Sequence, residues 1–234
     1  MLVNKAVTFS FDDGVEQDRR LISILNKYGL KCTFNLNSGL FGLKGTLTHQ
    51  GVTVNHFRLE EKEIKSLYVN HEVASHCLTH PNLLNLTEEE IIFEVETDRV
   101  NLSNIVGYEV VGFASPYGAQ DNRVEQILKN KTGVKYARNA NSNGKFDLQE
   151  NLYNFTNTSW ALQPFEETLR LAYEFINLKT EKNAIFYIGG HSYEMDLFEN
   201  GWENIETLCK VISGKQDIFY GTNKQVLLSN IWEK

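Results

Sequence analysis

The chain of 234 residues carries a formal net charge of −7 and is 41% hydrophobic and 23% charged, a composition typical of a globular protein. Its length suits one α/β barrel domain over residues 1–234. The acidic balance argues against a nucleic acid or a membrane as the main partner, since both need a basic face on the protein.

The cysteines and the N-terminus predict a cytoplasmic protein. Cys32, Cys77 and Cys209 cannot all pair and show no CxxC spacing, so we expect reduced, packed thiols rather than a disulfide framework. The first residues lack the basic start and apolar run of a signal peptide, and no stretch approaches the length of a membrane span.

The first half of the chain alternates between strand and helix patterns. A strand over residues 8–11 runs into Asp12-Asp13-Gly14, a helix is expected over 15–28 with a C-cap at Gly29, and a strand over 31–37. Residues 38–58 contain four glycines and no clear period, which indicates a loop or a small hairpin beside the site. A short helix over 59–68 and a strand over 70–75 follow.

The second half repeats the alternation. Thr87 to Glu90 form a capping-box pattern at the start of a long amphipathic helix. Further strands are expected over 109–114, 134–140, 152–155, 184–188 and 217–220, and further helices over 122–130, 165–178 and 202–212. Strand followed by helix roughly seven times predicts a parallel sheet, and in a chain of this length a distorted (β/α)7-type barrel.

Adjacent carboxylates end the first strand. Asp12 and Asp13 can share one pocket only where the strand turns, which Gly14 permits. One acid could then bind a cation while the other handles protons. The alternative is that Asp13 caps the following helix, since Asp-Asp-Gly is also common turn chemistry.

Two histidines that could bind the same cation as these carboxylates follow another predicted strand. The spacing His76-x3-His80, closed by Pro81, lets two imidazoles converge on one ion, and Asp13 would complete a set of two histidines and one carboxylate. Such a set leaves a coordination position open, as in catalytic metal sites. The alternative is a packed or capping pair of histidines. The C-terminal ends of parallel strands are where barrel enzymes place their active sites.

The motifs in this order resemble those of the polysaccharide deacetylases of carbohydrate esterase family 4, the NodB-homology domain. The first family motif corresponds to residues 10–14, the second to 76–80, the third to 114–118, and the last, an apolar strand ending in a histidine, to 185–191. The resemblance spans nearly the whole chain. It implies a metal-dependent hydrolase that removes N-acetyl groups from an N-acetylated carbohydrate.

The resemblance also implies a role for each motif residue. Asp13, His76 and His80 would hold one divalent ion, zinc first and cobalt or nickel as alternatives. Asp12 would be the general base and His191 the acid that protonates the leaving amine. The backbone N–H of Tyr117 would stabilise the oxyanion, and Pro116, Tyr117 and Trp160 would contact the substrate.

The chain departs from the family pattern at several positions. The arginine that begins the third motif and pairs with the base is replaced by Ala114, and Arg138 is the candidate replacement, the alternative being a solvated surface arginine. The fourth motif is only hinted at by residues 157–160, so Glu194 or Asp196 could orient His191 instead. Gly189 stands where the family has a leucine, which predicts a wider acetate pocket.

Two other functions stay open. The same site could act on a small non-polymeric amide, or the barrel could bind carbohydrate without hydrolysing it, as the missing arginine suggests. We expect His49, His56 and His71 to be surface or packing residues and Cys77 to be a small buried hydrophobe.

Overall fold

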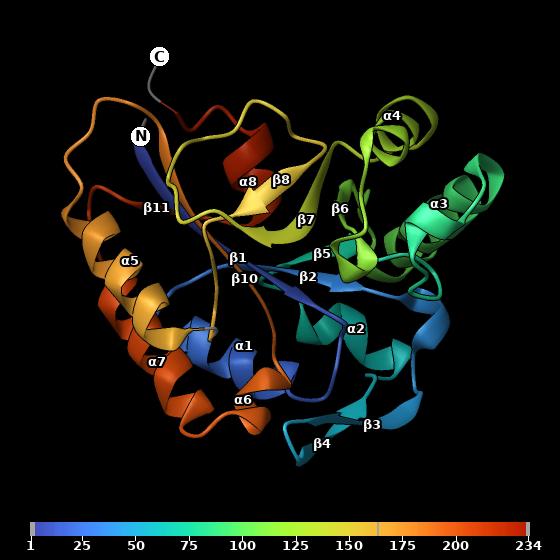
Figure 1. Cartoon of the computed structure of the whole chain (residues 1–234), viewed down its shortest axis with the longest axis horizontal. Coiled ribbons are helices and arrows are strands. Elements are labelled where there is room, and N and C mark those ends of the chain that lie inside the picture. Colours follow the sequence, from blue (N-terminus) through green and yellow to red (C-terminus); the bar gives the residue numbers. More distant parts are fainter. Residues whose placement is uncertain (1–2, 163, 233–234) are drawn as a thin grey trace.

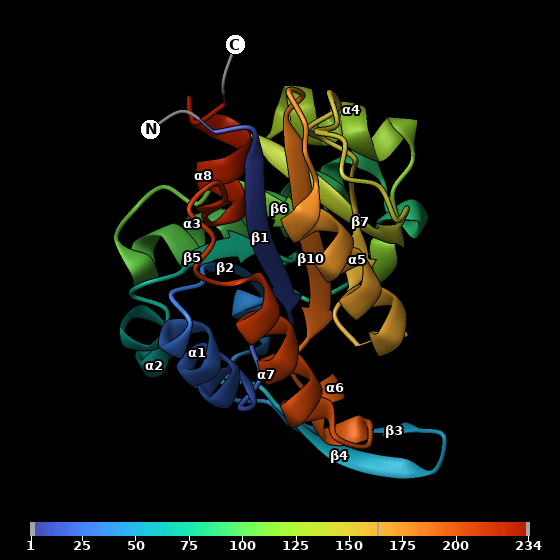
Figure 2. The same ribbon diagram turned by 90° about the vertical axis from the view of Figure 1, so that its left-hand side faces the viewer.

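The computed structural model describes residues 3–162 and 164–232, and its main sheet curls into a nearly closed barrel (Figures 1 and 2). All strand pairs in this sheet are parallel. In hydrogen-bonded order the strands are β8 (Phe155–Asn157), β7 (Tyr136–Ser142), β6 (Gly112–Ala114), β5 (Glu72–Ser75), β2 (Cys32–Leu36), β1 (Lys5–Asp12), β10 (Ala184–His191) and β9 (Ser159–Trp160), and β11 (Phe219–Tyr220) pairs with β1.

One short segment brings the two edges of the sheet together. Strand β8 pairs with β7 at one edge and β9 pairs with β10 at the other, yet only Thr158 separates β8 from β9 in the chain. The two edges therefore meet at neighbouring residues. The predicted barrel class is confirmed.

Helices cover the outside of the barrel (Figure 1). The longer ones are α1 (Asp18–Lys27), α2 (Glu61–Leu67), α3 (Glu88–Val106), α4 (Asn122–Lys131), α5 (Phe165–Asn177) and α7 (Gly201–Ile212). Shorter helical turns are η1 (Ser38–Leu40), η2 (Leu83–Asn85), η3 (Pro116–Gly118), α6 (Glu194–Leu197) and α8 (Asn223–Leu228). The predicted capping box is present, because the Thr87 side chain accepts a hydrogen bond from the Glu90 N–H and the Glu90 carboxylate accepts one from the Thr87 N–H.

Strand β1 lies at the centre of this architecture. All eight of its residues are buried, and Phe9 and Phe11 belong to the largest hydrophobic cluster together with Leu21 and Leu25 of α1. The sequence before Asp12 alternates, with Val7, Phe9 and Phe11 in the hydrophobic cluster and with Thr8 and Ser10 forming buried hydrogen bonds to Asn223, Asn35 and Arg138. The rigid centre of the barrel therefore carries the two acids.

A separate antiparallel hairpin consists of β3 (Lys44–His49) and β4 (Val52–Phe57). It projects from one end of the barrel (Figure 2). Its Val54 and Leu47 pack with Tyr193 and Leu197 around helix α6. Of the two forms that the sequence allowed for residues 38–58, the structure has the hairpin.

Some element boundaries differ from the prediction. Helix α1 begins at Asp18 rather than near Val15, because Val15 forms a β-bridge with Arg58. The strand expected over 152–155 lies at 155–157. Helices α6 and α8 have four and six residues, too few for a helical period to show in the sequence. Within residues 3–162 and 164–232, no helix combines the length and apolar character needed to cross a membrane.

Candidate active site

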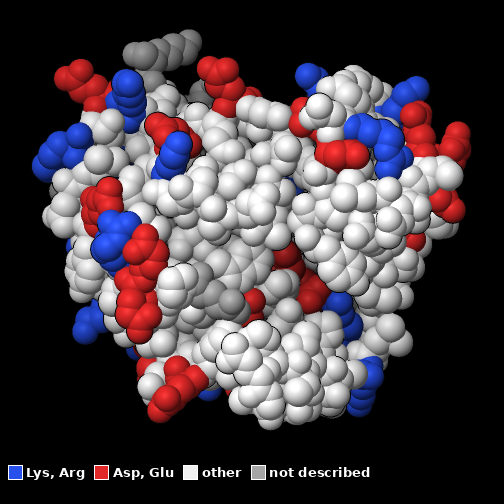
Figure 3. All heavy atoms as spheres, in the orientation of Figure 1, with Lys and Arg blue, Asp and Glu red and all other residues white. Residues whose placement is uncertain are grey.

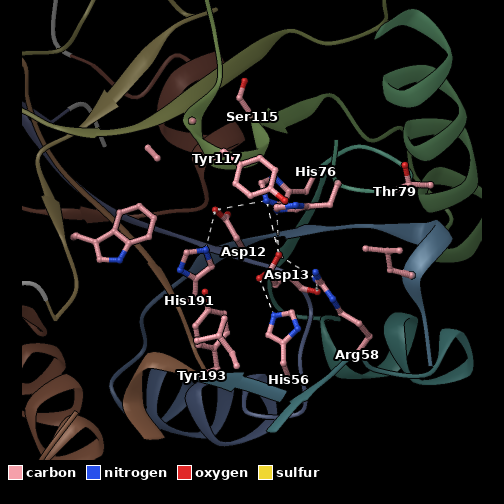
Figure 4. A pocket seen from close by; sticks show the side chains of 16 residues that line it. Asp12, Asp13, His56, Arg58, His76, Thr79, Ser115, Tyr117, His191 and Tyr193 are labelled. Carbon is pink, nitrogen blue, oxygen red and sulfur yellow. Dashed lines mark hydrogen bonds and ion pairs between the residues drawn. The ribbon is translucent and has the colours of Figure 1, made fainter. Parts of the chain in front are cut away.

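A pocket of about 480 Å³ opens at the C-terminal ends of the barrel strands (Figure 4). Acidic atoms are visible deep in a hollow of the surface, whose surroundings are largely uncharged (Figure 3). The lining residues are Asp12, Asp13, Leu40, Leu47, His56, Arg58, His76, Thr79, His80, Ser115, Tyr117, Gly118, Ala140, Trp160, His191 and Tyr193. The strand-end residues singled out by the sequence thus come together in one place.

The two carboxylate oxygens of Asp12 have different surroundings. Its Oδ1 accepts hydrogen bonds from Asn35 Nδ2 at 2.7 Å and from the Arg138 guanidinium. Its Oδ2 lies 3.9 Å from both His76 Nε2 and His191 Nε2. Burial alone would raise the pKa of Asp12, but the charge and the hydrogen bond of Arg138 hold it below its ordinary value. Asp12 is therefore ionised, with one oxygen directed at His76 and His191.

Arg138 is fully buried and paired with Asp12, not solvated. It reaches the site from β7, where its Nε donates to Ser10 Oγ at 2.9 Å and its Nη1 to the Asn139 carbonyl at 3.1 Å. These bonds fix the guanidinium beside Asp12, so Arg138 makes the ion pair with this carboxylate that Ala114 cannot make.

Asp13, His76 and His80 form a group of potential metal ligands whose donor atoms all lie within 4.8 Å of one another. Asp13 Oδ1 is buried and accepts no well-aligned hydrogen bond, although Arg58 Nη1 lies 3.1 Å from it as an ion-pair partner. The same oxygen lies 3.9 Å from His76 Nε2 and 3.7 Å from His80 Nε2. His76 Nδ1 donates to the Ala114 carbonyl at 2.7 Å, which leaves the Nε2 lone pair facing Asp13. The residues present thus fit a divalent ion, and Asp13 does not cap helix α1.

Both histidines of this group are neutral, the form that binds metals. Burial lowers the pKa of His76. Burial and the neighbouring His76 lower the pKa of His80 to about 4. The backbone around these ligands is strained. Asp13, Cys77 and His80 have φ values of 86°, 65° and 60°, a region that is unfavourable for residues other than glycine. Strain of this kind is common where side chains must converge on a site.

A buried carboxylate that the sequence analysis missed holds the His76 loop. Asp98 of α3 accepts hydrogen bonds from Ser75 Oγ at 2.6 Å, from the His76 N–H at 3.2 Å and from the Ser38 N–H at 2.6 Å. Asn37 Nδ2 also donates to the carbonyls of His76 and Cys77. In the sequence, Asp98 is only one of several polar positions of an amphipathic helix.

His191, the last residue of β10, is the register partner of Asp12 on the adjacent strand. Its Nδ1 lies 3.0 Å from Glu194 Oε1, and Trp160 Nε1 donates to the same oxygen at 2.8 Å. Burial would lower the pKa of His191, but the hydrogen bond and charge of Glu194 raise it to about 9. Of the two acids considered, Glu194 contacts His191, whereas Asp196 accepts from other residues, Gln17 and Trp202.

The predicted substrate-binding residues differ in their placement. The Trp160 and Tyr117 side chains line the pocket. The Trp160 ring lies 5.2 Å from the His191 ring, and the Tyr117 ring, 71% exposed, lies 4.7 Å from that of His80. Pro116 is buried and outside the pocket lining, so it only shapes the turn, in which Tyr117 has a φ of 59°.

The other histidines separate into two groups. His71 packs edge-on against Phe34 and accepts a hydrogen bond from the Cys32 N–H, and His49 packs against Phe198, as expected for packing and surface residues. His56 differs from the prediction, because its Nε2 lies 3.0 Å from Asp13 Oδ2 within the pocket. No local pattern identifies this contact, since it joins Asp13 to a distant hairpin. Cys77 is fully buried, as expected.

Gly189 does not widen the pocket, contrary to the prediction. A Cβ at this position would lie 2.9 Å from Asn157 Cγ and 2.9 Å from Trp160 Cε3. The space that a larger residue would occupy is thus filled by these two side chains, and glycine is required for close packing.

Comparisons with known proteins identify the family of the chain and proteins with a similar fold. The family described as polysaccharide deacetylase matches residues 2–137. A bifunctional xylanase/deacetylase of Pseudobutyrivibrio xylanivorans is 24% identical over 125 residues, which are 53% of this chain but only 18% of that protein.

Two solved structures with a similar fold both belong to carbohydrate esterase family 4. One is a family 4 carbohydrate esterase from Streptomyces lividans in complex with acetate, 17% identical, with a TM-score of 0.58 over 94% of this chain and 93% of that chain. Another is a family 4 pseudoenzyme from Bacillus anthracis, 18% identical, with a TM-score of 0.59 over 97% and 66% of the two chains. At these identities the likeness establishes the fold alone.

Proposed function

Because the chain belongs to the polysaccharide deacetylase family, we propose that it is a metal-dependent hydrolase that removes N-acetyl groups from an N-acetylated carbohydrate. The observation that carries the proposal is the geometry beside the Asp13, His76 and His80 group, where Asp12 Oδ2 lies 3.9 Å from both His76 Nε2 and His191 Nε2. Asp12 is held ionised and His191 protonated at neutral pH, as a general base and a general acid require.

Asp13, His76 and His80 would hold the ion. Zinc suits two imidazoles and one carboxylate, and cobalt or nickel can replace it. When bound, the ion supplies Lewis-acid polarisation of the acetyl carbonyl and acidifies water.

Two residues, Asp12 and His191, would each carry out one of the two proton transfers. Asp12 would take a proton from the attacking water through Oδ2, because Oδ1 is occupied by Asn35 and Arg138. His191 would then donate the Nε2 proton to the leaving amine, while Glu194 on Nδ1 holds the ring in place. The backbone N–H of Tyr117 is the proposed oxyanion donor, and Trp160 with the exposed Tyr117 ring would offer aromatic surfaces to a sugar.

The test is acetate release from N-acetylglucosamine oligomers by the zinc-loaded protein. We expect Asp12→Asn to lower kcat by about 10²–10⁴-fold, the usual contribution of a general base, while zinc content stays at that of the wild type. Thorough chelation should abolish activity and added zinc should restore it. Full activity of Asp12→Asn or of the chelated protein would refute the mechanism.

The same experiment separates the alternatives. Acetate release from small N-acetylated amides but not from oligomers would favour a non-polymeric substrate. Zinc binding without hydrolysis of any acetylated compound would favour the non-catalytic carbohydrate-binding barrel.

A further inference from the structure

The base of the β3–β4 hairpin reaches the proposed metal ligand Asp13 (Figure 4). His56, near the end of β4, places its Nε2 3.0 Å from Asp13 Oδ2. Arg58, just after β4, places its Nη1 3.1 Å from Asp13 Oδ1 and also donates to the Asp13 backbone carbonyl and to Asn37 Oδ1. Two residues outside the motifs thus contact both oxygens of one carboxylate.

The two contacts differ in their effect on the ligand. The hydrogen bond from His56 engages Oδ2 and so leaves Oδ1 directed at His76 and His80, whose Nε2 atoms lie 3.9 and 3.7 Å away. The His56 ring is itself fixed, because it packs edge-on against Tyr193 at 5.1 Å. Hydrogen-bonded partners of this kind hold a ligating carboxylate in its binding orientation.

Arg58 acts mainly through its charge. The site contains two carboxylates, Asp12 and Asp13, and each is paired with a guanidinium, that of Arg138 or that of Arg58. Imidazoles bind metal ions in their neutral form, so the formal charges of these four groups cancel, as do those of the His191–Glu194 ion pair. A site with no excess negative charge depends on its imidazole nitrogens for affinity, which favours zinc, cobalt or nickel over magnesium or calcium.

We propose that the hairpin base is the outer shell of the metal site, in which His56 is a positioning residue for Asp13 and Arg58 offsets the charge of that carboxylate. The inference rests on the proposed function in one respect, namely that Asp13 is a metal ligand. It adds that a hairpin outside the barrel sets the affinity of the site, with contributions of opposite sign from its two residues.

The test measures the Kd of zinc for the metal-free protein, by competition with a chromophoric chelator, together with the visible absorption spectrum of the cobalt form. His56→Phe keeps the ring that packs on Tyr193 but removes the donor, so we expect zinc to bind 10- to 100-fold more weakly and the cobalt spectrum to change. His56→Gln, which retains an N–H donor, should restore most of the affinity.

Arg58→Gln removes the charge but keeps donors for Asn37 and the Asp13 carbonyl, so we expect zinc to bind at least threefold more tightly at low salt. His49→Phe is the matched control, because His49 is on the same hairpin and packs against Phe198 instead of Asp13, and its Kd should equal that of the wild type.

Each outcome decides a different point. A wild-type protein that binds no zinc or cobalt overturns both the proposed function and this inference. Two results overturn the inference alone and leave the proposed function standing. One is a Kd for zinc that is unchanged in His56→Phe. The other is a Kd for zinc that rises as much in Arg58→Gln as in His56→Phe.

Discussion

Replacing Glu194 by glutamine should shift the pH dependence of the reaction. Glu194 is the carboxylate on His191 Nδ1, at 3.0 Å, and raises the pKa of that histidine to about 9 against the opposing effect of burial. An opposite charge this close is worth about 1–3 pKa units. Loss of two units would bring the pKa of His191 to about 7 and lower its protonated fraction at pH 8 about tenfold.

The assay is kcat for acetate release by the zinc-loaded protein between pH 5 and 10. Activity of the wild type should fall as the pH rises through about 9, because the acid loses its proton there. In Glu194→Gln this alkaline limb should move down by about 1–3 units, with little change at pH 6. Asp196→Asn is the control, since that carboxylate accepts from Gln17 and Trp202. An unmoved limb in Glu194→Gln, or an equal shift in the control, would refute the reasoning.

The same ion pair links folding to pH. Because the folded-state pKa of His191 is raised, the pair stabilises the fold fully below the unfolded value of about 6.5, and this contribution is lost as the pH rises through about 9. Urea unfolding at pH 6 and pH 10 should therefore show a smaller difference for Glu194→Gln than for the wild type.

Two further substitutions test the packing around the site. Arg138→Met should lower the free energy of unfolding by about 3–5 kcal/mol, because it leaves buried Asp12 without its partner. Adding Asp12→Asn should recover part of this loss in urea denaturation, and no recovery would show that Asp12 is not the cause. Gly189→Ala should cost about 1–3 kcal/mol, since its Cβ meets Asn157 and Trp160. An unchanged Tm would instead indicate the open space that the sequence analysis predicted.

The barrel and the strand-end residues could be predicted from sequence for a physical reason. Parallel strands deliver the residues that follow them to one end of a barrel, so Asp12, Asp13, His76 and His191 were expected to lie together. The structure places all four in one pocket.

The supporting residues could be predicted only in part, since the sequence offered Arg138 and Glu194 as candidates with alternatives but gave no sign of His56, Arg58 or Asp98. Arg138 is buried by its ion pair with Asp12, but a buried arginine and a solvated one look alike in a sequence. His56 and Arg58 reach Asp13 from a hairpin whose docking depends on tertiary contacts with Tyr193 and Leu197. Such contacts have no periodic signature, because they join segments that are distant in the chain.

The position of β1 in the sheet has a consequence for how the protein is synthesised. Strand β1 lies between β2 and β10, and Asp12 pairs in register with His191 near the other end of the chain. During translation, β1 and β2 emerge early, while the partner for the other side of β1 comes only with residues 184–191. Until then an apolar strand has an unpaired edge, which is a template for association with other chains. The strand that carries the proposed base is therefore also an edge at which a growing chain can associate with other chains.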